Sequence, residues 1–111
     1  MRRKLLDDMF MGAGLLHYIG HAGSDRFAQE GLLRTCDLAQ LSNSGRPCIV
    51  LAWTCVANRF EVPGTLCLGE SLLLQPNGGA VAVWAPTGIS RNPEACALDR
   101  GFLKAIRLAA G

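Results

Sequence analysis

The sequence has little charge of either sign and no long run of like charges. Only 18% of its 111 residues are charged, and the formal net charge is +2. A nucleic-acid-binding surface normally needs clustered lysine and arginine, so this balance argues against a nucleic-acid partner. Half of the residues are hydrophobic, which is typical of a globular chain and excludes a disordered one. The length predicts one small domain, residues 1–111.

Long hydrophobic stretches are also missing. No stretch approaches the roughly 20 apolar residues that cross a membrane. The apolar segment near the start, Met9–Leu16, is brief and is interrupted by two glycines. It does not have the form of a secretory core. The sequence therefore predicts neither a membrane segment nor a signal peptide, and it leaves the compartment unknown.

Paired cysteines are absent. The five cysteines are odd in number and none has Cys-x-x-Cys spacing, which argues against a disulfide framework and against a zinc ribbon. His17 and His21 lie four residues apart, but the segment lacks the glutamate of HExxH, and Gly20 disfavours a helix. The sequence therefore predicts no metal and no cofactor. His17 is expected to be satisfied locally within a strand, and most cysteines are expected to be small buried hydrophobes.

Apolar runs separated by glycine and proline predict alternating strands and helices. Three short runs without a polar face predict buried strands: Leu15–Ile19, Cys48–Trp53 and Ala80–Ala85. The predicted helices are Arg2–Met11, Thr35–Leu41 capped by Thr35, Thr65–Gln75 with Leu66, Leu72 and Leu73 inward, and Asp99–Ala110 with Phe102, Leu103 and Ile106 inward. The segment 20–31 is expected to be a loop. This alternation predicts an α/β fold with a short parallel sheet covered on both faces.

Two chemically active side chains follow consecutive predicted strands. His21 comes just after the first strand, and Cys55 comes just after the second. Functional residues of parallel sheets gather at the carboxyl ends of the strands, so these two side chains converge if the strands are neighbours. An imidazole beside a thiol can accept its proton or stabilise the thiolate. The pairing favours a Cys–His dyad over a turn histidine and an inert buried thiol. The other four cysteines are expected to be structural: Cys36, Cys48, Cys67 and Cys96.

Several motifs follow one another in the order found in gingipain-type cysteine peptidases, which belong to the caspase-like group. They are YIGHAG around His21, PCIVLAWTCVANRF around Cys55, Phe60-Glu61, Gly69-Glu70 and Gly78-Gly79. Over residues 12–106 the chain resembles the catalytic part of these enzymes. The resemblance implies a three-layer α/β/α caspase-like fold that is incomplete here, because the family has further strands upstream of the histidine strand. A missing upstream segment or a partner chain would complete the sheet.

The same resemblance implies a cysteine endopeptidase that acts on a peptide or protein substrate. Cys55 would be the nucleophile that forms an acyl-enzyme thioester, and His21 would be the general acid/base. The backbone N–H groups of Cys55 and Ala22 would stabilise the oxyanion. Ala22 stands where the family usually has glycine, which costs about 1 kcal/mol if the position needs a positive φ.

Two alternatives stay open at this point. Trp84, at the end of the third predicted strand, is either a wall of the substrate pocket or a core or rim aromatic. The chain itself is either an active peptidase or a catalytically inactive fragment or interaction module that keeps the fold. Similar peptidases are often secreted, but the sequence gives neither the compartment nor the cleaved residue type.

Overall fold

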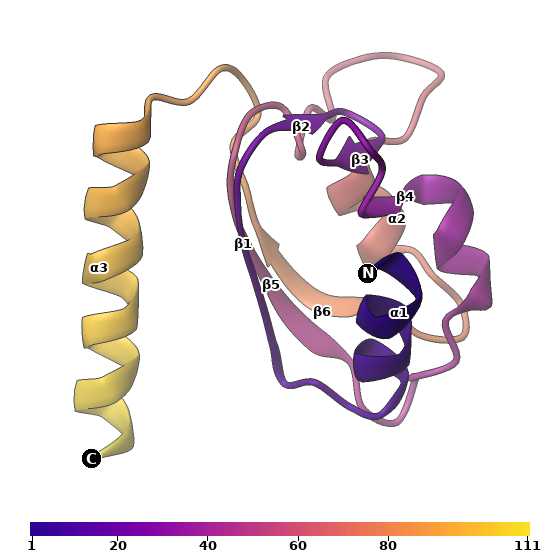
Figure 1. Ribbon diagram of the computed structural model, residues 1–111, viewed down its shortest axis with the longest axis horizontal. Coiled ribbons are helices and arrows are strands. Elements are labelled where there is room, and N and C mark those ends of the chain that lie inside the picture. Colours follow the sequence, from indigo (N-terminus) through magenta and orange to yellow (C-terminus); the bar gives the residue numbers. More distant parts are fainter.

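A three-stranded parallel sheet lies between two layers of helices in the computed structural model, which describes all residues from 1 to 111 (Figure 1). The strand order is β1 (Leu15–Ile19), β5 (Cys48–Trp53), β6 (Ala80–Trp84). One face carries α1 (Arg2–Phe10), the 3-10 helix η1 (Thr35–Gln40) and α2 (Leu68–Leu73). The other face carries α3 (Asn92–Ala110) alone. The predicted three-layer α/β/α arrangement is confirmed.

The central strand β5 divides its side chains between the two layers, because successive residues of a strand point to opposite faces. Val50 and Ala52 join the main hydrophobic core with residues of α1, η1 and α2. Leu51 and Trp53 point the other way and pack against Ala95 of α3. Nearly the whole strand is buried, as expected of a central parallel strand.

The two outer strands are edge strands, and the prediction that they are buried is wrong. Ile19 in β1 is 60% exposed and Val81 in β6 is 63% exposed. Each strand pairs only with β5, so one edge of each presents unpaired backbone groups. An apolar run reports the composition of a strand but not its place in the sheet, so the sequence did not distinguish edge from centre.

A second, small sheet occupies the segment after β1 that was expected to be a loop. It consists of β2 (Ala22–Gly23), β3 (Arg26–Phe27) and β4 (Leu33–Arg34), paired antiparallel. Strands of two residues show no alternation, which explains why the sequence pattern did not reveal them. Phe27 and Leu33 are buried in the main core. The small sheet therefore fixes the chain directly after β1.

The helices on the core face follow the predictions in part. Helix α1 confirms the first predicted helix, whereas α2 is shorter than the predicted 65–75. Leu72 is buried as expected, but Leu66 and Leu73 are 56% and 48% exposed. The 3-10 helix η1 is not capped by Thr35. Its cap is Arg34, whose N–H donates to the carboxylate of Asp37 over 2.9 Å.

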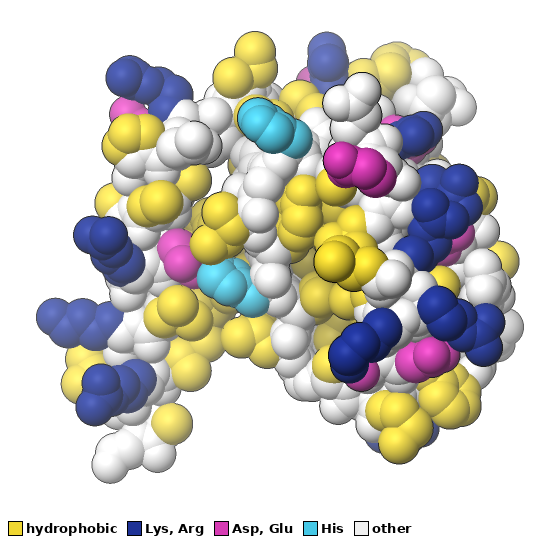
Figure 2. Space-filling view, in the orientation of Figure 1, with side chains coloured by type: hydrophobic (Ala, Val, Ile, Leu, Met, Phe, Trp, Pro, Cys, Tyr) yellow, Lys and Arg dark blue, Asp and Glu magenta, His cyan; other side chains and the backbone are white.

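Helix α3 begins at Asn92, well before the predicted start at Asp99. Pro93 lies in its first turn, where the missing N–H of proline loses no hydrogen bond. Only Ala95 of this helix is buried, and Phe102 packs against the same cluster. The predicted inward residues Leu103 and Ile106 are 40% and 43% exposed. Figure 2 shows exposed hydrophobic side chains along α3. No helix combines the length and apolar content needed to cross a membrane.

Candidate functional site

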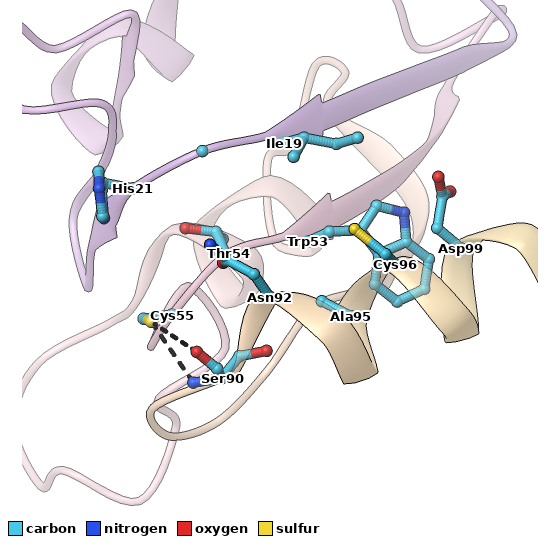
Figure 3. A pocket seen from close by; sticks show the side chains of 11 residues that line it. Ile19, His21, Trp53, Thr54, Cys55, Ser90, Asn92, Ala95, Cys96 and Asp99 are labelled. Carbon is cyan, nitrogen blue, oxygen red and sulfur yellow. Dashed lines mark hydrogen bonds between the residues drawn. The ribbon is translucent and has the colours of Figure 1, made fainter.

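His21 and Cys55 leave neighbouring strands at matching positions. Strands β1 and β5 are parallel and in register, with Ile19 opposite Trp53 at their carboxyl ends. His21 and Cys55 each lie two residues beyond that pair. Figure 3 shows both side chains past the ends of the two strands, on the same side of the sheet. The structure therefore brings the two predicted residues to one edge, where they line the same pocket.

The backbone carbonyl of His21 is held by two neighbours. The hydroxyl of Tyr18 donates to the carbonyl of His21 over 2.6 Å, and the N–H of Ala28 donates to the same oxygen over 2.9 Å. Tyr18 is in turn stacked on Phe27, with 4.4 Å between ring centroids. Gly20 has a φ of +156°, and a Cβ there would lie 2.7 Å from the Tyr18 hydroxyl. Only glycine fits this position, so the glycine of the motif is required by the turn into His21.

The imidazole of His21 has no hydrogen-bond partner within the chain. Its side chain is exposed, and the fixed contacts of the residue are all made by its backbone. A catalytic base is commonly oriented by a third group. The described residues supply no such group, and the side chain is free to adopt the rotamer that a bound substrate selects.

The chain after Cys55 takes an unfavourable backbone conformation. Val56 has a φ of +45°, which is a rare region for a β-branched residue and costs on the order of 1–3 kcal/mol. Its N–H donates to the carbonyl of Gly88 over 3.0 Å, and Gly69 in the first turn of α2 donates to Ala57 over the same distance. A Cβ on Gly69 would lie 1.6 Å from the side chain of Asn58. The Gly-Glu motif thus lets α2 pack closely under the loop that carries Cys55.

The pocket beside Cys55 has a volume of about 270 Å³ and lies between the strand ends and the start of α3. Thr54, Ser90 and Asn92 contribute polar groups to it. The hydroxyl of Thr54 is the one buried side-chain polar atom in the chain that has no hydrogen-bond partner. Asp99 is the only acidic residue of the lining, and no lysine or arginine takes part.

Burial distinguishes Cys55 from the other cysteines. All five thiols are free, but Cys48 and Cys67 are buried, and burial raises the pKa of both. A thiol of raised pKa is a poor nucleophile at neutral pH. Cys36 and Cys96 are exposed, so the expectation of burial is wrong for these two. Cys55 is partly exposed and lines the same pocket as His21, together with Cys96 of α3.

The backbone N–H groups of Cys55 and of Ala22, the residue after His21, are available as hydrogen-bond donors. The N–H of Cys55 donates to no acceptor in the chain. Ala22 lies opposite Phe27, and the hydrogen-bonded pair of this ladder is His21 with Ala28. Bonded and non-bonded pairs alternate in antiparallel ladders, so the N–H of Ala22 points away from β3. Ala22 does not have a positive φ, so alanine in place of glycine carries no backbone strain here.

Other predicted residues lie outside this pocket. Ala22 lines a neighbouring depression, which shares His21 with the main pocket. Trp84 packs edge-on against Trp53 and Phe102, at 5.4 and 5.1 Å between ring centroids, and lines a separate apolar groove under α3. This is the position of a packing aromatic, and a substrate-binding role for Trp84 stays a prediction.

The expectation that His17 is satisfied locally is wrong. Its Nε2 lies 2.7 Å from Oδ1 of Asp99, which is far away in the sequence. The indole nitrogen of Trp53 lies 3.0 Å from the same Nε2. One nitrogen cannot both donate to Asp99 and accept from Trp53, and the close carboxylate requires a proton on Nε2. We therefore assign the hydrogen bond to Asp99. No group of three or more histidine, cysteine or acidic side chains is arranged to hold a metal ion.

Sequence reasoning missed Ser90, Thr54 and Asp99 as pocket residues. Ser90 contributes backbone groups, which leave no trace in residue type. Asp99 was placed at the start of a helix, whereas it lies inside α3 and faces the sheet. The one indication in the sequence that Thr54 belongs to the site was that it directly precedes Cys55.

The model of peptidase family C25 matches residues 1–109. Among solved structures, the chain is similar to the complex of the RgpB pro- and mature domains from Porphyromonas gingivalis, with 23% identity and a TM-score of 0.71. That match covers 82% of this chain and 22% of the other. A second structure, described as a protease, is 22% identical with a TM-score of 0.73, covering 79% of this chain and 19% of the other.

These structural likenesses establish the fold. The chain spans about a fifth of the length of the solved structures that it matches. No curated protein matches it.

Proposed function

Because the chain belongs to peptidase family C25, the gingipain family of cysteine peptidases, we propose that it carries a cysteine endopeptidase site with Cys55 as nucleophile and His21 as general acid/base. The substrate is a peptide or protein, and the reaction passes through an acyl-enzyme thioester. No metal or cofactor is part of this proposal.

One observation carries the proposal. The only cysteine that shares a pocket with His21 and is also close to a strand end is Cys55, and the register of β1 with β5 places both residues two positions beyond the pair Ile19 and Trp53. A thiol needs a neighbouring base to become a nucleophile near neutral pH. Parallel strands whose carboxyl ends are in register bring the two residues to one edge of the sheet, although they are distant in the sequence.

The proposed reaction begins with transfer of the Cys55 proton to His21. The sulfur attacks the carbonyl carbon of the scissile bond, and the carbonyl oxygen becomes an oxyanion. The N–H groups of Cys55 and Ala22 donate to this oxyanion, since both are free of other acceptors. His21 then gives its proton to the leaving amine. Water hydrolyses the thioester, which releases the new carboxyl group and restores the thiol.

A second candidate is an inactive module that keeps the peptidase fold. The observation that favours it is the unpartnered imidazole of His21, which lacks an orienting group among the residues of this chain. Such a module would use its sheet for binding, and the unpaired outer edge of β1 is the surface available for this. An added strand from an upstream segment or a partner chain would pair there.

Hydrolysis and selective alkylation separate the two candidates. With a mixed peptide library as substrate, Cys55→Ala and His21→Ala should each lower the rate of hydrolysis at least about a hundredfold. Cys36→Ala, at an exposed cysteine outside the pocket, is the matched control and should keep the rate. A thiol probe should label Cys55 faster than the exposed Cys36, and His21→Ala should remove this preference. Equal labelling of all exposed thiols together with no hydrolysis would support the inactive module.

We also propose that residues 1–111 act as one domain. Unfolding in urea checks this, since a single sharp transition indicates one cooperative unit that needs no added strand. A broad transition that sharpens when an upstream segment is supplied would instead support an incomplete sheet.

A further inference from the structure

The loop that follows β6 reaches the sulfur of Cys55. The backbone N–H of Ser90 donates to Sγ over 3.4 Å, and Sγ lies 3.8 Å from the carbonyl oxygen of Ser90 (Figure 3). These are the only hydrogen bonds of this sulfur within the chain. Ser90 is 35 residues away in the sequence, so the contact is made by the fold and not by local geometry.

We propose that Ser90 is a positioning residue for the nucleophile, and that its backbone N–H orients the sulfur of Cys55 and stabilises the thiolate. This inference rests on the proposed function, because it concerns the reactivity of the same sulfur. The side-chain hydroxyl of Ser90 has no part in it.

The two contacts with Ser90 respond differently when the thiol loses its proton. In the neutral thiol, S–H donates to the carbonyl of Ser90 while the N–H of Ser90 donates to the sulfur. Once the proton has moved to His21, the sulfur has nothing to donate and the contact with the carbonyl ends. The N–H donor remains, and it becomes a charge-assisted hydrogen bond, which is stronger than a neutral one. The N–H contact therefore favours the ionised form, whereas the carbonyl contact favours the neutral thiol.

The loop is held in place by the chain that carries the nucleophile. The N–H of Val56 donates to Gly88 and the N–H of Asn58 donates to Pro86, both over 3.0 Å. The side-chain amide of Asn58 also donates to the carbonyl of Ala85 over 3.4 Å. Because these bonds tie the loop just before Ser90 to the chain just after Cys55, the N–H is oriented before a substrate binds.

Few charged side chains around the pocket can stabilise a thiolate, so the N–H of Ser90 matters more. The lining includes His21 after β1 and Asp99 and Cys96 on α3, but no lysine or arginine. The nearest arginine along the loop, Arg91, is paired with Glu94 over 3.6 Å and is highly exposed. Apart from protonated His21, no cationic side chain is available to balance a thiolate. Backbone N–H groups are the remaining source of positive potential, and the first turn of α3 adds to them.

The test compares three variants of the whole chain. Ser90→Pro removes the N–H, Ser90→Ala keeps it, and Ile89→Pro places proline at an adjacent exposed position whose N–H makes no hydrogen bond. The rate of Cys55 alkylation by iodoacetamide is followed by peptide mass spectrometry from pH 5 to pH 10, with Cys36 as an internal reference. Ser90→Pro should slow alkylation at pH 7 about tenfold and move the rise of the profile to higher pH. Ser90→Ala and Ile89→Pro should stay within about twofold of the native chain.

A measurement on the native chain covers the case in which Ser90→Pro does not fold. In a nitrogen-15-labelled sample, the amide proton of Ser90 should move downfield as the pH rises through ionisation of Cys55. The movement should be absent in Cys55→Ala. A Ser90 amide that does not respond while alkylation shows that Cys55 ionises would overturn the proposal, as would an unchanged pH profile in folded Ser90→Pro.

Failure of this inference is distinct from failure of the proposed function. Alkylation and the amide shift report on the thiol without any hydrolysis. Hydrolysis that depends on Cys55 and His21 but is equal in Ser90→Pro would leave the peptidase standing and remove the role of Ser90. If Ser90→Pro slows alkylation but no hydrolysis is observed, the role of Ser90 stands and the proposed peptidase activity fails.

Discussion

Nε2 of His17 in β1 lies 2.7 Å from Oδ1 of Asp99 in α3, although 82 residues separate them in the sequence. The contact bridges the edge strand and the helix that covers it. Both side chains are shielded in part, with exposed fractions of 30% and 13%. Since α3 buries little apolar surface of its own, this polar contact is a main link between the helix and the sheet.

Asp99→Asn should loosen α3. The amide keeps the size of the carboxylate but loses its charge, and we expect a decrease of about 1–2 kcal/mol in the free energy of unfolding. The tryptophan emission should move to longer wavelength, because Trp53 and Trp84 both lie under this helix. Urea unfolding and fluorescence measure the two effects. The control is Asp8→Asn in the exposed pair with Lys4, which should change stability by less than about 0.5 kcal/mol. Equal effects of the two changes would contradict this role of Asp99.

Gly20→Ala should disturb the turn that presents His21. The new Cβ would lie 2.7 Å from the hydroxyl of Tyr18, at a φ that side chains rarely adopt. We expect a loss of about 1–3 kcal/mol in stability, together with slower hydrolysis. Gly14→Ala is the matched control, because nothing lies within 4 Å of its Cβ. If both alanines cost the same, the close contact at Gly20 is not what fixes the turn.

The strain at Val56 can be measured by a pair of substitutions. Val56→Ala and Val56→Gly both remove the branched side chain, but only glycine relieves the positive φ of 45°. We expect Val56→Gly to be more stable than Val56→Ala by about 1 kcal/mol. Thermal and urea unfolding give the comparison. An alanine variant equal to or more stable than the glycine variant would show that the loop relaxes out of this conformation.

The buried carboxylate of Asp37 should make the stability of the fold depend on pH. Hydrogen bonds from Arg34 lower the pKa of Asp37, whose side chain is only 4% exposed. Because the pKa is lower in the folded chain than in the unfolded chain, the stabilisation is complete above the unfolded value. It is lost as the pH falls through the folded value. Asp37→Asn should therefore cost about 1–2 kcal/mol near pH 6, and the difference from the native chain should shrink below about pH 4. Asp25→Asn, in an exposed pair with Arg26, is the control and should show a much smaller difference.

Much of the scaffold could be predicted from the sequence because its elements are marked by local composition. The apolar runs of β1, β5 and β6 and the positions of His21 and Cys55 after them follow from glycine-bounded segments and from the motif order. Burial could not be predicted, because it depends on which strands lie at the edges. The exposure of Leu66 and Leu73 could not be predicted either, because α2 begins later than its pattern suggested.

The missed parts of the site depend on distant contacts. Ser90 touches Cys55 with its backbone, and Asp99 meets His17 across the sheet; neither contact has a signature in spacing. Helix α3 begins before the predicted Asp99 because Pro93 is compatible with a first helical turn. The positive φ of Val56 results from tertiary constraints and cannot be predicted from its residue type.

The register of β1 with β5 also determines where the chain tolerates changes of length. Residues added or removed between 44 and 47 alter a surface turn and leave the spacing from Ile19 to His21 and from Trp53 to Cys55 unchanged. One residue inserted at 20 or at 54 would advance one partner by about 3.3 Å and turn its side chain to the opposite face. Natural variation in length among related chains should therefore collect between these strands and avoid the two short exits.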